Sequence, residues 1–246
     1  AVAFVAGLFG SLIGIGGGII ITPLLVLGFG VDIRYAMGAA LASVIATSSG
    51  AAAAYLRDGI SNMQVGMFLC VATTIGAVLG ALLAGVLNPH LLSIIFGVAL
   101  LATLGLSFTK KESKSADSLP PDRLAQRLHL DGVMPDDRGG TGQPYHVQHV
   151  VGGFGVMTVA GFLSGLLGIG SGAFKVVGMD QVMQIPFKVT TTTSNFMIGV
   201  TAAASVGVYL KQGFFDPLLV YPVALGVLVG AFVGAKLIRV VPTGIL

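Results

Sequence analysis

Long stretches without a charged residue dominate the chain and alternate with short polar segments. A helix that crosses a hydrocarbon core of about 30 Å needs roughly 20 apolar residues, so most of these stretches hold one span. The stretch at 59–109 holds two, divided at Asn88-Pro89, because proline commonly begins a new helix. The pattern predicts spans near residues 1–30, 36–56, 64–87, 90–108, 150–180, 190–210 and 217–240.

The composition agrees with a membrane protein. Of the 246 residues, 54% are hydrophobic and 9% are charged, whereas soluble domains carry roughly 25% charged residues. This excludes an ordinary soluble enzyme and a disordered chain. The single cysteine, Cys70, excludes a disulfide scaffold or a multi-cysteine metal site. The net charge of +3 does not favour nucleic-acid binding. The predicted fold class is an all-α polytopic membrane protein with about seven or eight transmembrane segments.

Residues 110–146 have a different composition, with many charges and several prolines. Asp122 is expected to cap a short helix over Arg123–Leu130, with Leu124 and Leu128 on one face. We interpret the stretch as an extramembrane linker, a solvated tether; a regulatory role is the alternative. Basic residues directly after a span favour a cytoplasmic location.

The two sets of spans are similar to each other. An offset of 154 residues, which places Gly7 on Gly161, aligns them without a gap. It also superimposes 12–18 on 166–172, and 55–59 on 209–213. We predict repeat 1 at 1–109 and repeat 2 at 147–246, whose last segment is expected to be missing. Paired repeats are typical of secondary transporters. If each half crosses the membrane four times, the two repeats have the same orientation and are parallel. If the first segment is re-entrant, each half crosses three times and the repeats are inverted. The glycine break in the first segment favours inversion.

Glycines interrupt the first span of each half. Each glycine within a helix costs about 1 kcal/mol relative to alanine, so the run at 14–18 predicts a break. Unwound backbone inside a membrane occurs where protein or a wet cavity surrounds it, and it exposes N–H groups that can bind an anion. Close helix packing is the alternative. The candidate backbone donors are Gly16, Gly17 and Gly18, and Gly170, Ser171 and Gly172.

A polar run, residues 190–195, opens the span after Lys188. Thr192, Thr193, Ser194 and Asn195 are candidate donors to an oxyanion, with helix capping and hydroxyl back-bonding to the preceding turn as the alternative. The matching positions of the first half are apolar, so the second half is expected to supply most polar contacts of a single site.

Four basic residues lie within the predicted spans or at their ends. Lys175 lies inside an apolar stretch and is a candidate counter-charge for an anion, with a helix end nearer the membrane interface as the alternative. Arg34 and Lys188 occupy matching positions and either attract anions or anchor helix ends. Lys211, with Tyr209, is interpreted as an interfacial anchor.

The remaining glycine motifs indicate helix packing, and the sequence offers no motif for catalysis or cofactor binding. Gly76-x-x-x-Gly80 and Gly230-x-x-x-Gly234 are typical of close helix packing. No phosphate-binding loop for ATP is present in the sequence, and we predict no cofactor, no metal site and no enzymatic activity.

These residues together resemble the sulfite exporter TauE/SafE family, also called the toluene-sulfonate uptake permease family. The resemblance rests on the glycine run with Pro23, its counterpart at 161–172, the Thr-Ser-Asn helix start, and the Tyr-Leu-basic-x-Gly endings. It covers nearly all of the chain outside 110–146. It implies a multi-pass permease of the cell membrane that moves sulfite, organosulfonates or related anions without ATP. Val177, at the place that Pro23 occupies in the first half, and Lys175 depart from the family pattern.

The sequence therefore predicts a secondary transporter of small anions that works by alternating access. Its partners would be the anion and the lipid bilayer, with no nucleic acid, and a homo-oligomer is left open. An anion channel with the same pore-lining donors and a non-transporting membrane scaffold are the alternatives.

Overall fold

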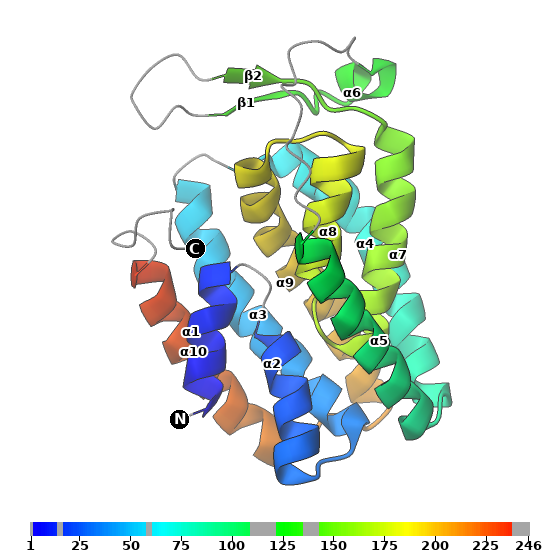
Figure 1. Cartoon of the computed structure of the whole chain (residues 1–246), viewed down its shortest axis with the longest axis vertical. Coiled ribbons are helices and arrows are strands. Elements are labelled where there is room, and N and C mark those ends of the chain that lie inside the picture. Colours follow the sequence, from blue (N-terminus) through cyan, green and yellow to red (C-terminus); the bar gives the residue numbers. More distant parts are fainter. Residues whose placement is uncertain (1, 14–16, 58–60, 109–121, 135–142, 238–246) are drawn as a thin grey trace.

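The computed structural model describes residues 2–13, 17–57, 61–108, 122–134 and 143–237. Its helices form one bundle, and a two-stranded antiparallel sheet lies at one end, which the prediction of an all-α chain missed (Figure 1). In chain order the elements are α1 (Val2–Ile13), α2 (Gly18–Pro23), the π-helical turn η1 (Leu24–Gly28), α3 (Ile33–Arg57), α4 (Met63–Val86), α5 (Pro89–Phe108), α6 (Arg123–Arg127), β1 (Gly132–Met134), β2 (Gln143–Tyr145), α7 (Val150–Leu167), α8 (Gly172–Val177), the π-helical turn η3 (Gly178–Val182), α9 (Phe187–Lys211) and α10 (Pro217–Leu237).

The helices follow the predicted spans closely. Within the described residues, α4, α7 and α9 are long and apolar enough to cross a membrane. Shorter apolar helical stretches cover Gly18–Gly28, Pro89–Thr103 and Pro217–Val233. The chain is thus a helical, polytopic membrane protein. The predicted division at Pro89 is confirmed, because α5 begins there.

The broken segment of the second half is a hairpin. Its first arm, α7, ends before Gly168, and α8 and η3 form its second arm. The N–H of Gln148, just before α7, donates to the carbonyl of Met183, just after η3, so both arms meet the same end of the bundle.

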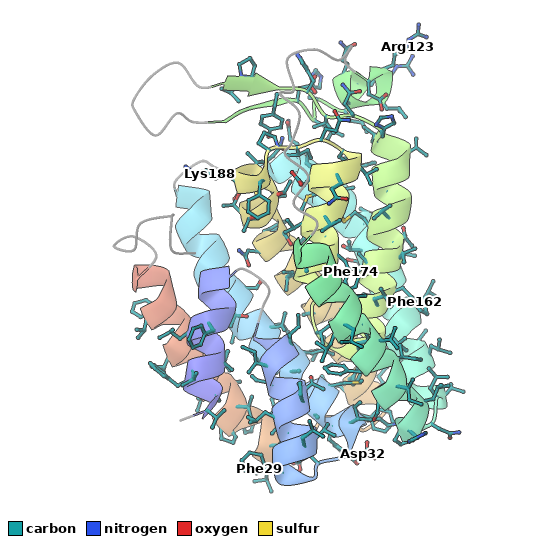
Figure 2. All side chains as sticks on the ribbon, viewed as in Figure 1. Phe29, Asp32, Arg123, Phe162, Phe174 and Lys188 are labelled. Carbon is teal, nitrogen blue, oxygen red and sulfur yellow. The ribbon has the colours of Figure 1, made fainter. Side chains whose placement is uncertain are left out.

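The broken segment of the first half starts and finishes at the opposite end. The N-terminus lies at the lower end in Figure 1, and Phe29, just after η1, lies at the lower end in Figure 2. Residues 14–16, where the sharpest part of the predicted glycine break falls, lie outside the described residues.

Helices α3 and α9 lie antiparallel across the centre of the bundle. Gly38, near the beginning of α3, lies against the backbone oxygen of Phe214, just after α9 ends. At the other end, Thr193 near the beginning of α9 accepts a hydrogen bond from the N–H of Asn62, which follows α3 in the chain.

Glycines bring four further helices into backbone contact in two pairs. A Cβ added at Gly76 of α4 would overlap the backbone oxygen of Thr158 in α7, and one added at Gly230 of α10 would overlap that of Phe4 in α1. The offset of 154 relates the first pair to the second, since 76 becomes 230 and 4 becomes 158. The packing interpretation of the Gly76 and Gly230 motifs is thereby confirmed.

The described part of the linker is a folded cap rather than a solvated tether, so that interpretation is wrong there. Leu130 and Tyr145 are buried among residues of α4, α9 and η3. The side-chain amide of Asn62 donates to the Leu130 carbonyl at 2.8 Å and to the Tyr145 hydroxyl at 2.9 Å. Its oxygen accepts from the N–H of Val65 and caps α4.

The short helix predicted in the linker exists, but its buried face differs. Asp122 caps α6 by accepting from the N–H of Leu124, as expected, and the helix is shorter than predicted. Leu124 and Leu128 are exposed, whereas Ala125 is buried. The reason is that α6 is too short to present a stripe, and residues after it make the deeper contacts.

Tyr209 corrects another expectation. It is fully buried rather than interfacial, and its hydroxyl donates to the carbonyls of Gly165 and Leu166, 3.2 Å away in each case. These are end carbonyls of α7, which have no partner within their own helix.

Candidate functional site

The two interrupted segments meet in the middle of the bundle. A Cβ added at Gly18, the first residue of α2, would lie 3.0 Å from the backbone oxygen of Gly168 and 3.3 Å from the Cα of Ile169. Gly17 and Gly18 are both buried. The predicted break of the second half is confirmed, because Gly168 and Gly170 adopt left-handed backbone angles, with φ of +68° and +74°.

The residues after this break are held by side-chain contacts. Ser171 has a φ of +43°, and its hydroxyl donates to the Ala160 carbonyl of α7 at 2.6 Å. The next residue, Gly172, is buried and begins α8. The Gly170-Ser171-Gly172 segment therefore lies at the tip of the hairpin, facing the first glycine segment.

Lys175 is completely buried, one turn into α8. Its Nζ donates to the Thr201 hydroxyl of α9 at 2.9 Å. Thr201 donates to the Met197 carbonyl at 2.6 Å, and its oxygen lies 3.2 Å from the hydroxyl of Thr73 in α4. Three helices thus converge on one lysine side chain, and every polar neighbour in this chain of contacts is neutral.

The first hydroxyls of α9 are used within the helix. Thr190 and Thr191 donate to the Phe187 carbonyl, and Thr192 donates to the carbonyls of Lys188 and Val189. Such back-bonding satisfies these hydroxyls locally. The back-bonding part of the alternative interpretation therefore describes Thr190 through Thr192, whereas no side chain caps α9.

The next three side chains differ, because two of them form hydrogen bonds with other segments and the third has a donor without a partner. Thr193 accepts from the N–H of Asn62 at 3.1 Å, and the Ser194 hydroxyl donates to the Gly172 carbonyl at a long 3.4 Å. Asn195 is 3% exposed, and its Nδ2 has no hydrogen-bond partner. A buried donor without a partner costs about 1–3 kcal/mol, which an acceptor from a ligand would remove.

Arg34 and Lys188 are not part of this cluster. Arg34 donates from Nη2 to the Leu87 carbonyl, and its guanidinium lies 5.0 Å from the centre of the Phe214 ring. Figure 2 labels Lys188 near the upper end of the bundle and Asp32, close to Arg34 in the chain, at the lower end. The structure therefore places the two basic residues at opposite ends of the bundle, which fits both helix anchoring and attraction of anions at two mouths. Gly16 lies outside the described residues.

Sequence reasoning missed Thr73, Thr201 and Ser164, which are buried hydroxyls. Ser164 of α7 also has no partner for its Oγ. The available signal was weak: Thr201 matches Thr47 at the offset of 154, so both halves carry a threonine within an apolar helix. Nothing in the sequence indicates that Thr73 lies beside it.

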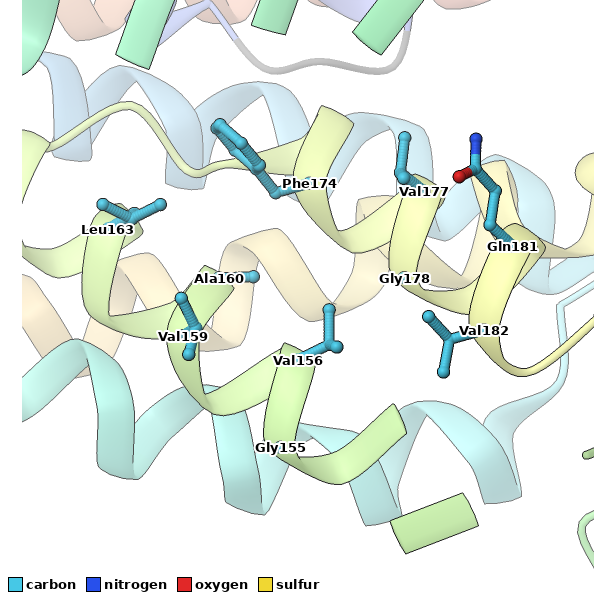
Figure 3. Close-up of a pocket in the computed structure, with 10 residues that line it drawn as sticks. All are labelled: Gly155, Val156, Val159, Ala160, Leu163, Phe174, Val177, Gly178, Gln181 and Val182. Atoms are coloured by element: carbon cyan, nitrogen blue, oxygen red, sulfur yellow. The ribbon is translucent and has the colours of Figure 1, made fainter. Parts of the chain in front are cut away.

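A groove between the two arms of the second hairpin is unsuited to an anion. Its volume is about 350 Å³, and apolar residues such as Val159, Leu163 and Phe174 line it (Figure 3). Gln181 alone among its lining side chains is polar. The cluster around Lys175, not this groove, has the donors that an oxyanion needs.

The cap carries one perturbed ionisable group outside the helices that cross the bundle. Burial raises the pKa of Tyr145, while the hydrogen bond from Asn62 opposes this effect and the carboxylate of Asp131 adds to it. The neutral phenol is therefore the form that the docked cap favours.

Comparison with known proteins identifies close similarity along the whole chain. The family model "Sulfite exporter TauE/SafE" matches residues 1–246. "Probable membrane transporter protein YunE" of Bacillus subtilis (strain 168) is 29% identical over 242 residues, covering 95% of this chain and 83% of that protein. "Probable membrane transporter protein YdhB" of the same organism is 28% identical over 246 residues, covering 100% and 91%. No solved structure matches the chain.

Proposed function

The chain belongs to the sulfite exporter TauE/SafE family of membrane transporters, and from this premise we propose that it carries small sulfur oxyanions, sulfite or organosulfonates, across the cell membrane by alternating access. The observation that carries the proposal is the complete burial of Lys175 among neutral hydroxyls, one turn into the helix that follows the second glycine segment. Ionisable residues inside membrane segments are typically functional. A transporter family also means that the chain is not an enzyme.

The proposed site lies where α8, α9 and α4 converge. Lys175 would supply the positive charge, and Asn195, Ser194 and Thr193 would supply side-chain donors. Backbone N–H groups of Gly170, Ser171 and Gly172 at the hairpin tip, with those of Gly17 and Gly18 opposite, would complete the shell. Thr192, Lys188 and Arg34 are left out of the proposal, because their hydrogen bonds or positions give each of them a role elsewhere.

The alternating-access part of the proposal rests on inverted repeats, 1–109 and 147–246. Three observations support it: α3 and α9 are antiparallel, the two hairpins enter from opposite ends, and the glycine contacts recur at the offset of 154. Inverted repeats can exchange their conformations, so a site between them opens first to one side and then to the other.

Counterflow in proteoliposomes tests this function. Purified full-length protein would be reconstituted into vesicles loaded with sulfite, with an organosulfonate, or with an unrelated carboxylate. We expect saturable exchange with the two sulfur oxyanions and little with the carboxylate. Equal exchange of all three would refute the sulfur specificity, and large single-channel currents without counterflow would favour an anion channel.

A further inference from the structure

The surroundings of Lys175 lack the negative charge that a buried ammonium needs. Its side chain is 0% exposed, and Nζ donates to the hydroxyl of Thr201. No carboxylate of the described residues lies within ion-pair distance of Nζ. The Thr201 oxygen can accept this bond in every state, because its own hydrogen is directed at the Met197 carbonyl.

The ionisable groups on the elements around Lys175 do not supply that charge. Helix α4 contributes Cys70, a thiol close enough to interact electrostatically with Nζ. The turn η3 carries Asp180, which is half-buried and whose Oδ1 has no partner. Helix α5 carries His90, exposed near its first residue. Helix α7 contains no ionisable residue, and those of α9 other than Tyr209 lie near its ends.

An isolated ammonium is costly to bury, because the interior replaces the water that would solvate it. A bound anion removes this cost by supplying the counter-charge. The reverse also holds: an anion without a nearby cation is equally costly in the same place. The charge on Lys175 and the anion therefore stabilise each other, and each favours the presence of the other.

We propose that Lys175 couples anion transport to proton transport by binding one proton together with the anion. On the loading side, a proton from water adds to the lone pair of Nζ as the anion enters, and forms an ammonium–anion pair. On the other side the anion leaves, and the ammonium returns its proton to water. One proton thus crosses with each anion, and the step is electroneutral for a monovalent anion. This inference rests on the proposed function.

Toluenesulfonate is the appropriate probe, because a sulfonate stays ionised near neutral pH and neither releases nor takes up protons itself. Binding to the purified wild-type protein in a weakly buffered solution would be followed with a pH-sensitive dye. We expect uptake of about one proton per bound sulfonate. Binding without proton uptake would overturn the proposal.

Proteoliposomes with a dye inside give the second readout. A sulfonate gradient directed inward should acidify the interior of wild-type vesicles, and the flux should not change with a membrane potential set by potassium and valinomycin. Lys175→Met should lower the sulfonate flux roughly 30-fold or more, as expected when one partner of a buried charge pair is removed. Lys175→Arg, which stays charged, should abolish the acidification and make any flux sensitive to the potential.

Two controls separate the possible failures. Lys211→Met removes a lysine from the exposed end of α9 and should behave as wild type. If Asp180→Asn abolishes proton uptake while the Lys175 variants keep it, Lys175 is not the coupling residue. Absence of sulfonate exchange in the wild type would refute the proposed function, whereas exchange without proton movement would refute only this inference. Absence of proton uptake by the wild type would overturn the inference even if the Lys175 variants do not fold.

Discussion

Replacement of Asn195 by leucine should separate the contribution of this side chain to protein stability from its contribution to anion binding. The side chain is 3% exposed, and its Nδ2 has no partner. An unsatisfied buried donor costs about 1–3 kcal/mol, and leucine has a similar volume without that donor. Asn195→Leu should therefore leave the free energy of unfolding unchanged or raise it by up to about that amount. In transport the same change removes a hydrogen bond to a charged ligand, worth about 1.5–3 kcal/mol, so anion affinity should fall roughly 10- to 150-fold.

Thermal unfolding in detergent gives the first quantity, and the half-saturating concentration for sulfite counterflow gives the second. The matched control is Thr22→Val, which removes another buried hydroxyl without a partner, in α2 of the first half. It should show the same stability effect with unchanged transport. A destabilised Asn195→Leu protein with wild-type affinity would show that the amide has a structural role, and would refute its assignment to the site.

Three further predictions concern packing and the cap. Gly161→Ala should lower the free energy of unfolding by about 1–3 kcal/mol, because the new Cβ would overlap the backbone of Thr73; Gly97→Ala, which meets open space, should not. Asn62→Ala removes the cap of α4 and both side-chain bonds to the linker, so limited proteolysis should cut within 122–149 faster than in wild type; equal resistance would contradict this docking role. Because the pKa of Tyr145 is raised in the folded protein, wild-type stability should fall as pH rises above about 10, where the unfolded phenol ionises; the fall should be smaller in Tyr145→Phe, and identical pH profiles would refute it.

The helices could be predicted because membrane segments are long, apolar and free of charges. The start of α5 at Pro89 and the capping of α6 by Asp122 also have local causes within a few residues. The position of Tyr209 could not be predicted in this way. Its hydroxyl satisfies end carbonyls of α7, and those carbonyls are free only because the chain breaks at Gly168 and turns back.

The site was predictable in its residue types but not in its assembly. Lys175 is recognisable because an ionisable residue interrupts an apolar stretch, and Asn195 because it follows a run of hydroxyls. That Lys175 contacts Thr201, and through it Thr73, depends on the hairpin that carries α8 back between two long helices. The back-bonding of Thr190 through Thr192 likewise depends on where α9 begins, and single-sequence patterns locate helix ends only to within a few residues.

The way in which the two halves differ argues for one site rather than two. At the offset of 154, glycines in backbone contact match each other, as Gly76 and Gly230 do. Thr201 matches Thr47, but the lysine and the asparagine have no polar counterparts: Lys175 falls on Ile21 and Asn195 on Leu41, and both of these apolar residues are buried. The helix contacts are thus shared by the two halves, whereas the lysine and the asparagine are present in the second half alone. This arrangement suits a carrier in which the repeats exchange conformations around a single anion. In such a carrier the counter-charge needs to be present only once, and a second buried lysine at the position of Ile21 would have no anion to pair with.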